Sequence, residues 1–163
     1  MTLGWITCLP RAEASPVEQA RVFQASPREI PVALYDTLVF SDTVNYRGMM
    51  FTGIPNLLWV FGYFRGSWTV RADLLSDFVC RLLTHMDDKD AQRVEVKLRP
   101  EDEDMELLPW QDPENFNPGY LTRAMPLLPK SGAKPEWHHS QNLAEDLKVI
   151  PGIDLDGEEF VWG

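Results

Sequence analysis

The distribution of apolar and polar residues is most informative between residues 57 and 86. Residues 57–61 read Leu-Leu-Trp-Val-Phe, a continuous apolar run that stops at Gly62. A run of this kind predicts a strand covered on both faces, as in a parallel sheet. After a turn over residues 62–68, apolar residues recur at helical spacing through residues 70–86. This spacing predicts a helix with one wide apolar face.

The predicted helix has a start signal, a stop signal and a polar side. Ser67 or Thr69 is the expected N-cap, because a short hydroxyl side chain accepts a hydrogen bond from a free N–H of the first turn. Residues 87–90 read Asp-Asp-Lys-Asp and are expected to end the helix. Asp77 and Arg81 are four residues apart and are expected to pair. The polar residues off the apolar face are Arg71, Asp73, Asp77, Arg81 and His85.

Short strands are predicted on both sides of this helix. Residues 34–46 are expected to contain β structure, and Met-Met-Phe at 49–51 is expected to form a second short strand. After the helix, Val94, Val96 and Leu98 alternate with polar residues, which predicts a half-buried strand. Taken with the helix, these segments predict an α/β fold.

The two ends of the chain have weaker patterns. Residues 1–33 are broken by four prolines and are expected to form a poorly ordered arm. The last sixty residues contain seven prolines and are expected to form an irregular tail. Within that tail, short helices are predicted near 120–128 and 140–147, and a terminal turn and strand near 155–160.

Composition restricts the class of protein. The chain has 163 residues, which suits one domain. Its formal net charge is −10, from 25 acidic and 15 basic residues. This charge argues against binding to nucleic acid or to an anionic membrane surface. No uninterrupted apolar run approaches the ~18 residues of a membrane-spanning helix. The two cysteines, Cys8 and Cys80, are too few for a disulfide framework, so a cytoplasmic location is expected.

The turn between the predicted strand and helix is the candidate binding site. The free N–H groups and the dipole at a helix N-terminus favour an anionic group, such as the N1–C2=O edge of a reduced flavin. The alternative is an ordinary strand-to-helix connection, which spacing alone favours. No phosphate-binding glycine fingerprint is present elsewhere in the chain.

Other polar residues do not predict catalysis or metal binding. His138 and His139 are adjacent and lack further ligands at zinc spacing, so they are interpreted as surface or tail histidines. The acidic run at residues 101–104 lacks the spacing of a calcium loop and is interpreted as a solvated turn. Ser67 lacks the Gly-x-Ser-x-Gly context of a nucleophile. The prediction is therefore no catalytic residue and no metal site.

Several separate motifs resemble one family when they are taken in order. Residues 46–57 read Tyr-Arg-Gly-Met-Met-Phe-Thr-Gly-Ile-Pro-Asn-Leu, and Gly62-Tyr63 and Ser67-Trp68-Thr69 follow. The tail adds Gly-Tyr-Leu-Thr-Arg-Ala at 119–124, Leu-Pro-Lys-Ser-Gly at 128–132, Pro-Glu-Trp at 135–137, and Gln141-Asn142 followed by Asp146. Together they resemble the C-terminal part of flavin-containing monooxygenases, in the Baeyer–Villiger branch that includes ethionamide-activating enzymes. The resemblance covers residues 35–163.

The resemblance implies a fold with two dinucleotide-binding domains, one for FAD and one for NADPH, that oxygenates ketones or heteroatoms. It implies that residues 34–163 are the C-terminal part of the FAD domain, with residues 49–86 as its last strand and helix. It also implies that the turn approaches the flavin ring. The cofactor-binding residues carried over are Gly62, Tyr63, Ser67, Trp68 and Thr69.

The departures from the family are equally informative. Neither the FAD-binding nor the NADPH-binding Gly-x-Gly-x-x-Gly is present, and residues 1–33 match nothing in the family. Phe64-Arg65-Gly66 and Leu143 also differ from the family pattern. We therefore expect a truncated or frame-disrupted product that binds neither nucleotide alone and is not catalytic by itself.

Three roles remain open for such a chain. The first is a role with a partner chain that carries the nucleotide-binding domains. The second is that of a structural or interaction module that uses the apolar faces of 57–61 and 70–86 for another protein or for self-association. The third alternative is a product without function that aggregates or is degraded.

Overall fold

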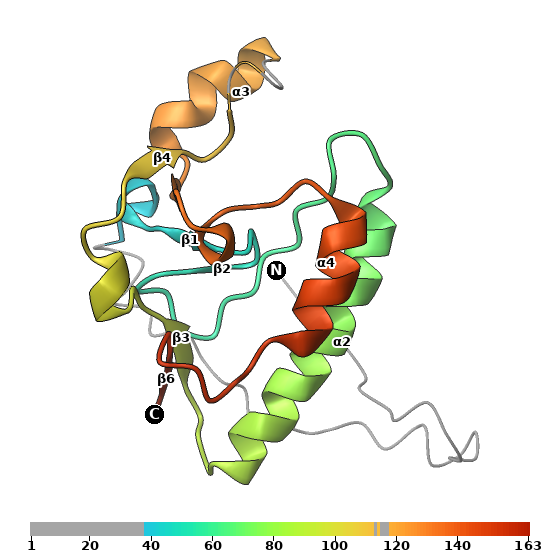
Figure 1. Cartoon of the computed structure of the whole chain (residues 1–163), viewed down its shortest axis with the longest axis vertical. Coiled ribbons are helices and arrows are strands. Elements are labelled where there is room, and N and C mark those ends of the chain that lie inside the picture. Colours follow the sequence, from blue (N-terminus) through green and yellow to red (C-terminus); the bar gives the residue numbers. More distant parts are fainter. Residues whose placement is uncertain (1–37, 113, 115–117) are drawn as a thin grey trace.

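The computed structural model describes residues 38–112, 114 and 118–163 (Figure 1). The predictions for residues 1–33 and for the first part of 34–46 lie outside this part of the chain. The described residues form a mixture of α-helices and short strands, as the sequence predicted. None of the helices in this part of the chain has the length and apolar composition needed to cross a bilayer.

The strands of the described residues pair as three two-stranded antiparallel ribbons. The pairs are β1 (Asn45–Tyr46) with β2 (Met50–Phe51), β3 (Val94–Val96) with β6 (Phe160–Trp162), and β4 (Leu107–Pro109) with β5 (Lys130–Gly132). Isolated parallel bridges at Val44–Lys130 and Thr52–Val96 connect the first ribbon to the other two. The predicted strands near 49–51, 94–98 and the C-terminus are confirmed.

The predicted strand at residues 57–61 is wrong. Residues 57–63 belong to no strand, although the Trp59 N–H donates to the Met49 carbonyl at 2.8 Å. The apolar run is instead half-buried through its aromatic side chains, because Trp59 packs on Phe51 and Phe61 packs on Trp110. A continuous apolar run predicts that its residues are buried, but not by what kind of structure. Here the packing of aromatic rings buries them, and no sheet is involved.

The long helix α2 (Trp68–Asp88) is confirmed, with Ser67 as its N-cap. The Ser67 hydroxyl accepts a hydrogen bond from the Thr69 N–H at 3.3 Å. The predicted apolar face is buried through Leu74, Leu75, Phe78, Leu82 and Met86. Two polar residues behave differently from their expected roles: Arg71 is buried, and Arg81 donates to the carbonyls of Ile150 and Ile153 at 3.1 and 2.6 Å.

The tail folds back over the rest of the molecule. Its helices are α3 (Gly119–Ala124) and α4 (Leu143–Val149), which confirms the two predicted tail helices. In Figure 1, α4 lies alongside the N-terminal half of α2, while α3 and β4 lie at the opposite side of the view. Trp137 and Phe160 bring the tail into the core, where both rings contact Tyr46 edge to face.

The acidic turn at residues 101–104 is not wholly solvated. Asp102 is completely buried and accepts hydrogen bonds from Arg99 Nε at 2.6 Å and from Trp137 Nε1 at 2.9 Å. Lys134 also pairs with it. These donors outweigh the effect of burial and hold the pKa of Asp102 well below its usual range. The prediction of a solvated turn is therefore wrong for Asp102, whose partner Lys134 lies 32 residues further along the chain.

Candidate functional site

A pocket of about 280 Å³ opens at the N-terminus of α2. It is lined by Tyr63, Phe64, Arg65, Gly66, Ser67, Val70, Gln141 and Leu143. Six of these residues come from the turn and first helical turn that the sequence singled out, and two come from the tail. Its lining residues in the described part of the chain include the cationic Arg65 and no carboxylate. The pocket is therefore suited to binding an anionic or neutral group.

The five predicted cofactor-binding residues occupy different positions around this pocket. Tyr63 and Ser67 line it, and Gly62 lies directly before it. A Cβ at Gly62 would lie 2.5 Å from the Cβ of Trp68, so the turn requires glycine at this close approach. Trp68 is 64% exposed, and the exposed Thr69 hydroxyl lies 2.6 Å from the Ser67 hydroxyl.

The hydroxyl of Tyr63 is already engaged within the protein. It donates a hydrogen bond of 2.7 Å to Asp146 Oδ2. Burial, followed by this interaction with Asp146, raises the pKa of Tyr63 to about 12. Tyr63 therefore contributes its ring to the pocket, while its hydroxyl serves to attach the turn to the tail.

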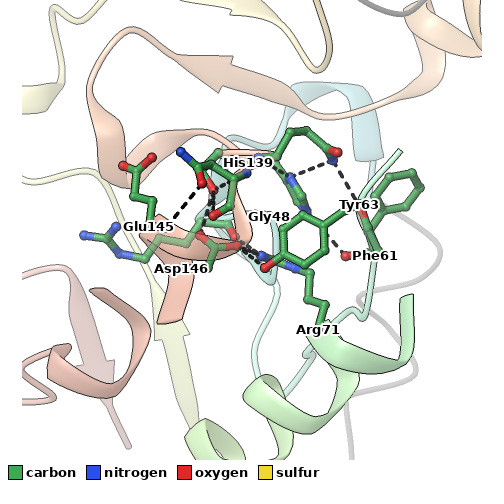
Figure 2. Close-up of polar contacts among 12 residues, drawn as sticks. Gly48, Phe61, Tyr63, Arg71, His139, Glu145 and Asp146 are labelled. Carbon is green, nitrogen blue, oxygen red and sulfur yellow. Dashed lines mark hydrogen bonds and ion pairs between the residues drawn. The ribbon is translucent and has the colours of Figure 1, made fainter. Parts of the chain in front are cut away.

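Asp146, which accepts this hydrogen bond, forms a buried ion pair with Arg71 (Figure 2). Arg71 Nη1 contacts Asp146 Oδ2, and the Arg71 side chain is 0% exposed. Arg71 Nη2 also donates to the carbonyl of Arg47 at 2.5 Å, and its guanidinium lies 5.5 Å from the centre of the Tyr63 ring. Ser140 Oγ donates to the other carboxylate oxygen of Asp146 at 2.7 Å. The pair thus connects α2, α4 and the turn.

His139 lies on the other side of the turn, where the sequence predicted a surface or tail histidine. It is 7% exposed, so that prediction is wrong for His139. Its Nδ1 accepts from the Gln141 N–H at 3.2 Å, which leaves the proton on Nε2, 3.4 Å from the Phe61 carbonyl. Burial, with the charge of Arg71, lowers the pKa of His139 to about 4. The imidazole is therefore neutral near pH 7.

Gly48 makes room for this histidine. Its φ is +65°, and a Cβ there would lie 2.1 Å from His139 Cδ2. Figure 2 shows Gly48 and His139 beside each other, with Tyr63 and Phe61 nearby. Only glycine satisfies both the backbone conformation and the contact.

Gln141 connects the tail directly to the backbone of the turn. Its Oε1 accepts from the Phe64 N–H at 2.7 Å, and its Nε2 lies 3.3 Å from the Gly62 carbonyl. The same Nε2 lies 2.8 Å from His139 Nδ1. Gln141 also lines a second pocket of about 450 Å³, together with residues 108–112 at the end of β4.

The sequence did not identify Arg71, His139, Gln141 and Asp146 as members of one site. Arg71 was assigned to the polar side of the helix, and 75 residues separate it from Asp146. The available signal was the tail motif Gln141-Asn142 followed by Asp146, which resembles the family but does not show what these side chains contact. Within the described residues, no three His, Cys, Asp or Glu side chains gather in a way that could hold a metal ion.

Comparisons with curated proteins give several relatives. The chain is 45% identical over 120 residues to FAD-containing monooxygenase EthA of Mycolicibacterium smegmatis, and 43% identical over 118 residues to that of Mycobacterium tuberculosis. These matches cover 74% and 72% of the chain and 23% of each relative. The probable FAD-binding monooxygenase AlmA of Acinetobacter baylyi is 31% identical over 116 residues, which is 71% of the chain and 22% of that protein.

The chain therefore spans about a quarter of the length of the curated relatives that it matches. No protein-family model matches the chain, and no solved structure resembles it at a significant level.

Proposed function

We propose that this chain is the counterpart of one segment of its relatives, the FAD monooxygenases, and that it forms one wall of a flavin site. The wall is the turn and helix start that contain Gly62, Tyr63, Ser67, Trp68 and Thr69. The observation that carries this proposal is the pocket at the N-terminus of α2, in a chain whose relatives contain FAD.

The chemistry of the pocket suits the pyrimidine edge of a flavin. The first-turn N–H groups of α2 and the helix dipole favour negative charge, which develops on N1–C2=O when the flavin is reduced. Arg65 adds a positive charge to the same pocket. The rings of Tyr63 and Phe64 supply apolar surface for an aromatic ligand.

The size of the pocket limits what the chain can hold alone. At about 280 Å³ it is smaller than most pockets for drug-sized ligands, which run from about 300 to 1,000 Å³. It fits one edge of the flavin ring and not a whole FAD molecule. We therefore assign the remaining FAD contacts, and the NADPH site, to protein outside these residues, either in a longer polypeptide or in a partner chain.

The activity that follows is oxygenation of a ketone or a heteroatom, and the chain is not expected to perform it alone. FAD, when bound and reduced by NADPH, would supply the oxygen activation. The residues of this chain would bind and orient one edge of the ring and exclude water from it. The cytoplasmic location expected from the sequence stays a prediction.

A chimera tests the proposal. The segment of the Mycolicibacterium smegmatis relative that matches this chain is replaced by the corresponding residues of this chain, and FAD per polypeptide is measured from the visible absorbance. We expect about one FAD per chimera. Gly62→Ala should lower the FAD content, because its Cβ would meet Trp68 at 2.5 Å.

The matched control is Gly152→Ala, where an added Cβ has no neighbour within 4 Å. This variant should keep its FAD. The proposal fails if the chimera unfolds cooperatively on heating but carries no FAD. It also fails if Gly62→Ala and Gly152→Ala chimeras carry equal amounts of FAD.

A second candidate role is that of an interaction module. The observation in its favour is the exposure of large apolar side chains around the start of α2: Trp68 is 64% exposed, Val60 40% and Val70 38%. Sedimentation of the purified chain distinguishes the two roles. A colourless, stable dimer that Trp68→Ser converts to a monomer would favour the interaction module.

A further inference from the structure

We infer that Gln141 and Asp146 are positioning residues of the proposed flavin wall, because they hold three consecutive residues of the turn, Gly62, Tyr63 and Phe64, in place. This inference rests on the proposed function and adds the tail to it. The tail would not contact the reacting atoms. It would fix the wall against which the flavin lies.

Gln141 acts on the backbone of the turn. Its carboxamide accepts from the Phe64 N–H at 2.7 Å and lies within 3.3 Å of the Gly62 carbonyl. One side chain therefore bridges the two peptide groups on either side of Tyr63. Gln141 has φ +52°, a left-handed conformation that is uncommon for a residue with a side chain. Such strain persists where the surrounding contacts over-determine the conformation.

Asp146 acts on the side chain between those two peptide groups. Its carboxylate accepts from the Tyr63 hydroxyl at 2.7 Å and from Ser140 Oγ at 2.7 Å, and it pairs with Arg71. Arg71 belongs to the beginning of α2, so the same carboxylate attaches both the turn and the helix to the tail. Figure 2 shows Tyr63, Arg71 and Asp146 converging on this point.

The charges explain why a carboxylate is suited to this position. A buried guanidinium needs an anionic partner, and Arg71 is 0% exposed. Apolar residues of similar volume often stabilise a fold equally well, but they do not fix the direction of a hydroxyl or of a peptide group. The polar contacts therefore determine where the turn lies, which is the property that a ligand wall requires.

Hydrogen exchange on the full chain tests whether Gln141 holds the turn in place. Gln141→Met keeps the length of the side chain and removes both polar contacts with the turn. We expect the Phe64 amide to exchange about fivefold faster, the loss expected for one ordinary hydrogen bond. The amides of Val94 and Val96 in β3 should be unchanged, which shows that the variant remains folded.

The matched control is Gln92→Met, because the Gln92 side chain is exposed. It should leave the exchange of Phe64 unchanged. Equal Phe64 exchange in Gln141→Met and the original chain would overturn the inference. The same conclusion follows if Gln92→Met accelerates Phe64 as much as Gln141→Met does.

The effect of Gln141 on flavin binding is tested in the chimera described above. Gln141→Met should weaken FAD binding about fivefold or more and shift the visible spectrum of the bound flavin, while Gln92→Met should change neither. If Gln141→Met accelerated exchange of the Phe64 amide but left the FAD affinity and the flavin spectrum unchanged, the role of Gln141 in flavin binding would be overturned. If the unsubstituted chimera binds no FAD while the exchange result holds, the proposed function fails and the contact between tail and turn remains.

Discussion

Arg71 and Asp146 illustrate how a buried ion pair responds to the loss of one partner. Arg71→Met removes the cation but leaves the carboxylate of Asp146 buried, with Tyr63 and Ser140 as its remaining donors. We expect the free energy of unfolding to fall by about 3–5 kcal/mol. Urea denaturation measures this change.

The control for this prediction is Arg93→Met. Arg93 also pairs with a carboxylate, that of Glu95, but its side chain is 55% exposed. Exposed pairs contribute less than about 1 kcal/mol, so this variant should be nearly as stable as the original chain. A similar loss in both variants would contradict the importance given to the buried pair.

His139 makes the stability of the chain depend on pH. Its pKa is lowered from 6.5 to about 4, mainly by burial and then by Arg71, against the opposite effects of the Phe61 carbonyl and of Asp146. Between these values the unfolded chain binds a proton that the folded chain does not. The free energy of unfolding should therefore fall as the pH decreases from about 6.5 to about 4.

The measurement is the urea midpoint at several pH values across that window. His139→Gln removes the titrating group and should flatten the dependence, whatever its effect on stability at pH 7. Asp102 titrates at lower pH, because its folded pKa is depressed and its stabilisation is lost only as the pH falls below its ordinary value of 3.8. If the urea midpoint of His139→Gln depended on pH as steeply as that of the original chain, other groups would control the stability in this pH range.

Gly48 and Gly53 allow backbone strain to be separated from a side-chain contact. Both have positive φ, +65° and +74°, but only Gly48 has a neighbour, His139, where a Cβ would be. Gly53→Ala should cost about 1–2 kcal/mol of the free energy of unfolding for the left-handed conformation. Gly48→Ala should cost more, because His139 must also move. Equal losses in thermal or urea unfolding would contradict the close contact.

At the scale of the element, α2 combines a local start signal with burial from the rest of the fold. Ser67→Ala removes the acceptor for the Thr69 N–H and should lower the free energy of unfolding by about 1 kcal/mol. Ser76→Ala, inside the same helix, removes only a hydroxyl bonded to the Ala72 carbonyl and should be close to neutral. Chemical denaturation of both variants checks the difference.

The helix and strand predictions differ in accuracy because a helix depends on nearby residues, whereas a strand depends on a partner elsewhere in the fold. The helix predicted at 70–86 is observed as Trp68–Asp88, because its apolar periodicity and its cap are local properties of the sequence. The strand predicted at 57–61 is absent, because strand pairing requires a neighbour that the sequence does not specify. Its apolar residues found ring partners instead.

At the scale of the whole molecule, the tail contributes as much to the core as the central helix does. β6 is the antiparallel partner of β3, and Phe160 lies 5.5 Å from the ring of Tyr46. Ending the chain after Gly157 removes both contacts. We expect this shortened chain to lose its cooperative thermal transition, which differential scanning calorimetry measures. A transition with the original midpoint would show that the tail is dispensable for folding.

The sequence by itself determined the local features. These are the helix predicted at 70–86 with Ser67 or Thr69 as its cap, the two short tail helices, and the position of the turn that forms the pocket. It also carried enough separate motifs to resemble the FAD-containing monooxygenases, which are its curated relatives. These features depend on periodicity, capping and short motifs, which neighbouring residues specify.

Only the tertiary structure decided which distant residues complete the site. Arg71 and Asp146 are 75 residues apart, and Gln141 and Phe64 are 77 apart. No periodicity connects such positions, because their proximity depends on how the tail folds back on α2. The buried state of Arg71, His139 and Asp102 was unpredictable for the same reason, since a charged or titratable residue is buried only where the fold brings it a partner.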